Sequence, residues 1–166
     1  MRSPAEQFEI IGLMAAHESE IAELYRAYAQ RFAQCREFFL RLAAEEVEHA
    51  RLISGLAGKV RTGEVHVGPG RFSATAILTS LDYVGERLRE AKERDLPLAA
   101  ALAICRDLEW GLIEKRFFDI IEEDGPEIME LLRRLSDETA AHRASLDTAP
   151  CVTTEDNHAG ESSAGR

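Results

Sequence analysis

Two residues near the middle of the chain, Glu46 and His49, have the types and the spacing of metal ligands. On a helix, residues three apart point the same way, and this pair shares its face with the apolar residues Phe39, Leu42 and Ile53. A carboxylate on a buried face is costly unless it is protonated, paired or bound to a metal. One oxygen and one nitrogen ligand at this spacing form the Glu-x-x-His half of a carboxylate-bridged dinuclear metal site.

The same short pattern also arises by chance on solvated helices, because the chain has 30 acidic residues among 166. Residues on other helices decide between the two interpretations. Glu18 lies on the apolar stripe of the first expected helix, Glu109 on that of the fourth, and His142 on the inward face of the last. Inward glutamates on three different helices, with histidines at matching depth, favour a metal centre over satisfied core residues.

Apolar periodicity and the glycine and proline breaks predict five helices, over residues 4–31, 37–56, 73–94, 97–120 and 127–146. The third helix has no inward carboxylate and is expected to be a crossover helix. The predicted fold is therefore an all-α four-helix bundle with one additional helix. Gly55 and Gly58 are expected to end the second helix, and residues 59–71 to form a loop that exposes His66.

A faint internal repeat supports two helical hairpins that face each other. Residues 42–49 align with residues 135–142, so that His49 corresponds to His142. The first and fourth helices each carry two glutamates five residues apart, namely Glu18 with Glu23 and Glu109 with Glu114. Each hairpin is expected to deliver a glutamate from one helix and a histidine from the next.

Composition limits the partners of the chain. A formal net charge of −10, without a clustered basic face, argues against binding to nucleic acid or to an anionic membrane, whereas ferrous iron or another cation suits it. No signal-like or membrane-spanning apolar stretch is evident, and we expect a cytoplasmic protein. We expect residues 1–149 to form one domain and residues 150–166 to be a disordered tail.

The cysteines are odd in number, far apart and never in a Cys-x-x-Cys pair; they are Cys35, Cys105 and Cys151. This spacing argues against a disulfide framework or a rubredoxin-type iron centre, and it fits a reducing compartment.

The motifs resemble those of a known family. Segment 17–25, with Glu18 followed seven residues later by Tyr25, resembles the first helix of rubrerythrin-type members of the ferritin-like superfamily, and segment 44–50 resembles their second-helix motif. The resemblance covers residues 4–146. It implies a ferritin-like four-helix bundle with a connecting helix, a di-iron or related centre, and redox chemistry on peroxide or dioxygen.

The chain departs from this family pattern on its last helix. Family members commonly carry a second Glu-x-x-His there, but Thr139 stands three residues before His142, and Glu138 is one position early, rotated by about 100°. Leu112 replaces a further family glutamate, and the rubredoxin module that relays electrons in many members is missing. The electron donor is therefore unknown.

Charge counting leaves the number of metal ions open. Two ferrous ions and three glutamates leave one positive charge over, so either Glu138 turns inward, a hydroxide or oxo bridge compensates, or only one ion binds tightly. Iron is the expected metal, with manganese or zinc as alternatives, because mixed carboxylate and imidazole ligands do not distinguish them.

The leading hypothesis is an oxidoreductase with the metal ligands Glu18, Glu46, His49, Glu109, Glu138 and His142. In this hypothesis Tyr25 is a catalytic residue that hydrogen-bonds a ligand or a bound oxygen species. Two alternatives remain, which are iron binding or storage without turnover and a structural bundle with a degenerate metal site. The resemblance is compatible with a homodimer.

Overall fold

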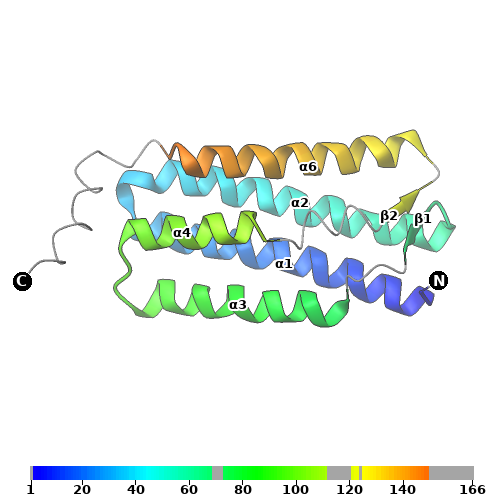
Figure 1. The fold of residues 1–166 in the computed structure, drawn as a ribbon, viewed down its shortest axis with the longest axis horizontal. Helices are drawn as coiled ribbons and strands as arrows, with labels where there is room; N and C mark the ends of the chain where they lie inside the picture. Colours follow the sequence, from blue (N-terminus) through cyan, green and yellow to red (C-terminus); the bar gives the residue numbers. More distant parts are fainter. Residues whose placement is uncertain (1, 69–72, 112–120, 124, 150–166) are drawn as a thin grey trace, which may run out of the picture.

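The structure is a computed structural model that describes residues 2–68, 73–111, 121–123 and 125–149. Within these residues it contains five α-helices: α1 (Pro4–Arg31), α2 (Arg36–Thr62), α3 (Ala74–Glu93), α4 (Leu98–Glu109) and α6 (Pro126–Asp147). A short 3-10 helix, η1 (Ala33–Cys35), joins α1 to α2. Figure 1 shows the five helices side by side along the long axis of the molecule, which confirms the predicted all-α bundle.

The first helix begins and ends where the sequence predicts. The Ser3 hydroxyl accepts a hydrogen bond from the Glu6 backbone N–H at 3.3 Å, and the Glu6 carboxylate accepts one from the Ser3 backbone N–H at 2.7 Å. This reciprocal capping box satisfies two donors that the first helical turn leaves unpaired. Ser73 caps α3 in a similar way, through a bond from the Ala76 backbone N–H at 3.2 Å.

The second helix is longer than predicted. Gly55 and Gly58, the expected C-terminal breaks, lie inside α2. An interior glycine costs roughly 1 kcal/mol relative to alanine, and the burial of Leu56 and Val60 offsets this cost. The helix ends at Thr62 and is followed by Gly63, whose φ of 77° is a left-handed conformation that glycine adopts without strain.

A two-stranded antiparallel ribbon replaces part of the expected loop. β1 (Val65–Val67) pairs with β2 (Ile121–Glu123), and His66 is the register partner of Glu122. Both valines of β1 are buried, and the second donates its backbone N–H to Gln7 Oε1 at 2.8 Å. The expectation of an exposed loop histidine is therefore wrong, since His66 lies half-buried in a strand.

The fourth helix is shorter than predicted, because α4 ends at Glu109 rather than near residue 120. Gly111 N–H bonds to the carbonyl of Leu108, in a tight turn that closes the helix. Leu112 and Glu114, which the sequence places on this helix, lie outside the described residues.

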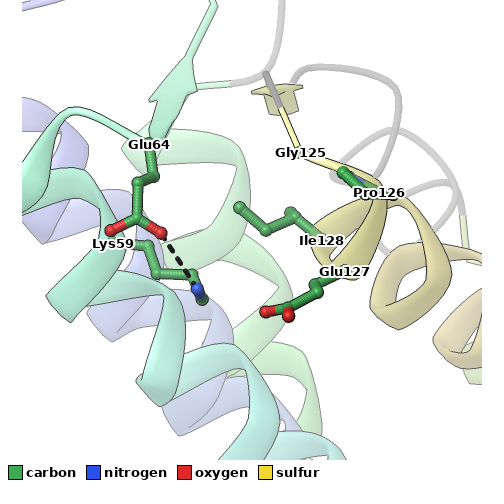
Figure 2. Close-up of a pocket in the computed structure, with 6 residues that line it drawn as sticks. All are labelled: Lys59, Glu64, Gly125, Pro126, Glu127 and Ile128. Carbon is green, nitrogen blue, oxygen red and sulfur yellow. Dashed lines mark hydrogen bonds and ion pairs between the residues drawn. The ribbon is translucent and has the colours of Figure 1, made fainter.

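A hollow of about 220 Å³ lies at the end of the bundle where α6 begins (Figure 2). It is lined by Lys59, Glu64 and residues 125–128, and Lys59 donates to the Glu64 carboxylate at 3.1 Å. Residue 128 is about 20 Å from His142 along α6, at 1.5 Å per residue. This hollow is therefore separate from the centre of the bundle.

The apolar core forms two clusters with a polar layer between them. Along α1, Met14 belongs to one cluster and Ile21 to the other, and Glu18 lies between them. The same change from one cluster to the other occurs along α2 and α6. The buried polar residues at these changes are Glu46 and His49 in α2 and His142 in α6. Two apolar clusters thus seal the polar layer along the bundle axis.

The additional helix is α3, which lies beside α1 on the side of the molecule away from α6 (Figure 1). His17 of α1 and Ser80 of α3 join the two helices through a hydrogen bond of 2.8 Å between His17 Nε2 and the serine hydroxyl. The remaining helices α1, α2, α4 and α6 surround the polar layer.

One expectation about the cysteines is wrong. Cys35 is disulfide-bonded, whereas Cys105 is a buried free thiol. This disulfide removes the cysteine pattern as an argument for a reducing compartment. The expected tail, 150–166, lies outside the described residues. Among the helices that the structure describes, none is long and apolar enough to cross a membrane.

Candidate metal centre

Glu46 is the central residue of the polar layer. Its side chain is fully buried, with a relative exposure of 0%, and its carboxylate faces two histidines. Glu46 Oε2 lies 3.0 Å from His49 Nδ1, and Glu46 Oε1 lies 2.9 Å from His142 Nδ1. One ligand atom from each of these three buried residues lies within 4.8 Å of the other two. The sequence predicted all three as metal ligands, and the structure brings them together.

Helix geometry explains this convergence. Glu46 and His49 are one turn apart on the buried face of α2, and α6 lies beside α2 (Figure 1) with His142 on its own buried face. The two imidazole rings are stacked, with centroids 5.4 Å apart and an interplanar angle of 24°. Both rings therefore present the same nitrogen, Nδ1, to the one carboxylate between them.

Glu109 adds a second carboxylate from α4. Its Oε1 lies 3.7 Å from His142 Nδ1 and accepts a hydrogen bond of 2.6 Å from the Tyr25 hydroxyl. Its Oε2 is buried and has no hydrogen-bond partner among the described residues. Such an oxygen is expensive to bury unless a cation or a proton accompanies it.

Side-chain contacts between α4 and α6 keep Glu109 opposite His142. Arg106 donates to the backbone carbonyl of Leu146 at 2.8 Å. Beside the site, the Arg143 guanidinium lies 4.2 Å from the centroid of the Trp110 ring, a cation–π contact. Trp110 and Arg143 directly follow Glu109 and His142 in the sequence, so this contact couples the two site residues.

Glu18 is buried in the same layer, with a relative exposure of 1%. Its Oε1 lies 3.7 Å from Nδ1 of His17, the residue that bonds to Ser80 of α3 through its other ring nitrogen. The group of ligand atoms formed by Glu46, His49 and His142 does not include it. Its burial agrees with the sequence expectation, and its role as a metal ligand stays a prediction.

Glu138 does not point at the buried carboxylate in this structure. Its Oε2 accepts a hydrogen bond from His49 Nε2 at 3.0 Å, and its Oε1 accepts one from Arg134 at 2.7 Å. Thr139, which occupies the expected glutamate position, donates its hydroxyl to the Leu135 carbonyl at 3.0 Å. The last helix therefore contributes His142 to the inner group, while Glu138 contacts the outer face of the opposite histidine.

Sequence reasoning missed one residue of the site. Glu45 Oε2 accepts a hydrogen bond from His142 Nε2 at 2.6 Å, although Glu45 is partly exposed and lies off the buried stripe. The signal that could have revealed it is the internal repeat, in which Glu45 aligns with Glu138. Each stands four residues before a histidine.

The electrostatics of the layer follow from burial and from these contacts. Burial opposes ionisation of Glu46, but the contacts with His142 and His49 outweigh it and hold its pKa below the usual 4.5. Burial also opposes protonation of His142, yet the carboxylates of Glu109 and Glu46 raise its pKa above the usual 6.5. Burial raises the pKa of Glu109, and burial together with the charge of Glu109 raises that of Tyr25.

The donor set fits a divalent cation. Each histidine faces a carboxylate at both ring nitrogens, which either a doubly protonated imidazole or a cation beside Nδ1 would satisfy. His142 Nδ1 and Glu46 Oε1 are both buried without a hydrogen-bond partner among the described residues. Two protons on the inner Nδ1 atoms carry the same charge as one divalent ion, so their exchange leaves the net charge of the buried layer unchanged. Carboxylate oxygen and imidazole nitrogen are ligands for iron, manganese and zinc.

Comparison with known proteins gives a family match. Residues 9–100 match the family described as Rubrerythrin. The matched segment contains Glu18, Tyr25, Glu46 and His49, whereas Glu109 and His142 lie beyond it. The comparisons with curated proteins and with solved structures found no match.

Proposed function

This chain belongs to the rubrerythrin family, and on this premise we propose that it is a metal-dependent oxidoreductase that holds iron in a di-iron centre and acts on peroxide or dioxygen. The observation that carries the proposal is the fully buried carboxylate of Glu46 between two Nδ1 atoms. When bound, ferrous iron would supply the electrons that reduce such an oxidant.

The proposal assigns the ligands by position. Glu46 would hold the metal through its carboxylate, and His49 and His142 would provide the nitrogens. Glu109 and Glu18 provide further carboxylates from α4 and α1, and both are at most 5% exposed. The two apolar clusters on either side exclude bulk water, which strengthens every charge interaction within the layer.

Tyr25 acts on the centre through Glu109. Its hydroxyl donates to Glu109 Oε1 at 2.6 Å, and because its pKa is raised well above 10.0 it remains a donor at neutral pH. We propose that it orients the Glu109 carboxylate and leaves Oε2 available to a cation. Tyr25 is therefore a positioning residue for Glu109. Its direct contact with an oxidant stays a prediction.

A second candidate function is metal holding without turnover. The observation that favours it is Thr139, which supplies no carboxylate and bonds to its own helix instead. Fewer carboxylates leave a second ferrous ion less fully compensated in a dry core.

The test is anaerobic loading with ferrous ion, followed by metal analysis and by peroxide consumption with an artificial reductant. Glu46→Gln should lose most of the bound metal while the helices remain. Glu130→Gln should keep it, because Glu130 is an exposed partner of Arg133 on α6. Full metal content in Glu46→Gln would contradict the ligand assignment, and tightly bound metal without consumption of peroxide or dioxygen would favour the second candidate.

A further inference from the structure

Each histidine of the centre lies between two carboxylates of different character. The inner nitrogen, Nδ1, faces the fully buried Glu46. The outer nitrogen, Nε2, donates to a partly exposed glutamate, at 3.0 Å from His49 to Glu138 and at 2.6 Å from His142 to Glu45. The inner and outer faces of both rings are thus distinct.

The outer contacts are reciprocal between two helices. Glu45 of α2 binds the histidine of α6, and Glu138 of α6 binds the histidine of α2. Each glutamate stands four residues before the histidine on its own helix, so the aligned repeat places them at equivalent positions. A single surface ion pair usually contributes little to stability. Here the same contact occurs twice across one helix pair, which indicates a shared role for the two glutamates.

We propose that Glu45 and Glu138 are a reciprocal pair of positioning residues, each of which keeps the proton on Nε2 of the opposite histidine so that both rings present Nδ1 to a divalent cation beside Glu46. The inference rests on the proposed metal centre and specifies how its nitrogen ligands are oriented. A neutral imidazole has one N–H and one lone pair, so a carboxylate that accepts from Nε2 leaves the lone pair on Nδ1. The same contact fixes the plane of the ring and raises the basicity of the ligand nitrogen.

The negative charges of the two positioning residues, Glu45 and Glu138, are not equally balanced by neighbouring cations. Glu138 also accepts from Arg134 at 2.7 Å, so part of its charge is already balanced on its own helix. Among the described residues, Glu45 has no lysine or arginine within ion-pair distance, and its hydrogen-bond partner there is His142. The loss of Glu45 should therefore weaken the site more than the loss of Glu138.

A neighbouring glutamate provides a matched control. Glu45, Glu48, Arg134 and Glu138 line a hollow of about 160 Å³ on the α2/α6 side of the protein. The Glu48 carboxylate accepts instead from Arg51 on its own helix, at 2.6 and 2.8 Å. Glu48→Gln removes the same charge from the same hollow, so it separates a general electrostatic effect from the specific contact with a ring nitrogen.

The experiment uses zinc, which is diamagnetic, as the probe on the full chain. Long-range ¹H–¹⁵N NMR of the zinc-loaded protein should show both histidines bound through Nδ1 with the proton on Nε2. Chelator competition should show zinc affinity lowered by about 10- to 100-fold in Glu45→Gln and Glu138→Gln, more strongly in the former, and unchanged in Glu48→Gln. The tautomer measurement needs no variant, so it stands even if a substitution impairs folding.

Three outcomes would overturn the inference. The first is binding of zinc through Nε2 in the unsubstituted protein. The second is an affinity in both glutamine variants equal to that of Glu48→Gln, which would remove the positioning role but leave the proposed function intact. The third is a protein that binds neither zinc nor ferrous ion, which would remove the proposed function as well.

Discussion

Replacing Tyr25 with phenylalanine isolates one buried hydrogen bond of the centre. Phenylalanine fills the same space, so the variant removes the hydroxyl without creating a cavity. The lost bond is short, at 2.6 Å, and both partners are at most 5% exposed. A hydrogen bond to an ionised carboxylate contributes about 1.5 to 3 kcal/mol. We therefore expect Tyr25→Phe to lower the free energy of unfolding of the metal-free protein by about 2 kcal/mol near neutral pH.

The pH dependence of this loss has a definite sign. Burial raises the pKa of Glu109 above 4.5, so keeping it ionised in the folded state costs stability as the pH rises through that raised pKa. The Tyr25 hydroxyl reduces this cost, because its bond to the carboxylate favours the ionised form. Below pH 4.5 the carboxyl is neutral in both the folded and the unfolded state, and the bond contributes only about 1 kcal/mol.

Urea unfolding followed by circular dichroism measures this difference. A loss of 2 kcal/mol corresponds to a fall in Tm of about 4 to 8 °C for a chain of this size. The substitution should cost more near neutrality than below pH 4.5, with little change in the denaturant slope. An equal cost at both pH values, or none, would refute the assigned bond between Tyr25 and Glu109.

Three further outcomes follow from the polar layer. First, His142 and His49 hold the pKa of Glu46 below 4.5, so its contribution to stability is present above pH 4.5 and is lost as the pH falls below that value. Acid unfolding of Glu46→Gln, followed by circular dichroism, should lack this loss of stability. Second, binding of one divalent ion near neutral pH should release about two protons, measured by calorimetry in buffers of different ionisation enthalpy; release of none would contradict the protonated inner nitrogens. Third, Thr139→Glu places a carboxylate one turn before His142 and should increase the number of ferrous ions bound per chain, whereas an unchanged number would show that this position does not reach the centre.

The sequence predicted the elements whose ends are set by local chemistry. Ser3, Pro4 and Glu6 determine the start of α1, and these signals act within one helical turn. The end of α2 was mispredicted because Gly55 and Gly58 are tolerated inside a helix whose apolar face is packed. The strand pairing of residues 65–67 with residues 121–123 depends on segments far apart in the chain, which local periodicity does not reveal.

The inner residues of the centre were predictable because each is a polar side chain on an otherwise apolar stripe. Glu46, His49 and His142 needed only helical spacing to be recognised. Glu45 and the outer contact of Glu138 were not recognised in this way, because both side chains are partly exposed and meet a histidine only when α2 and α6 are placed side by side. Their contacts are a property of the packing of two helices rather than of either helix alone.

The most direct test of the central claim is anomalous diffraction from crystals of the protein loaded with ferrous or manganous ion. The account predicts an anomalous peak within coordination distance of the Glu46 carboxylate and of the Nδ1 atoms of His49 and His142. Peaks only at exposed carboxylates, with both histidines still bonded to Glu46, would contradict it.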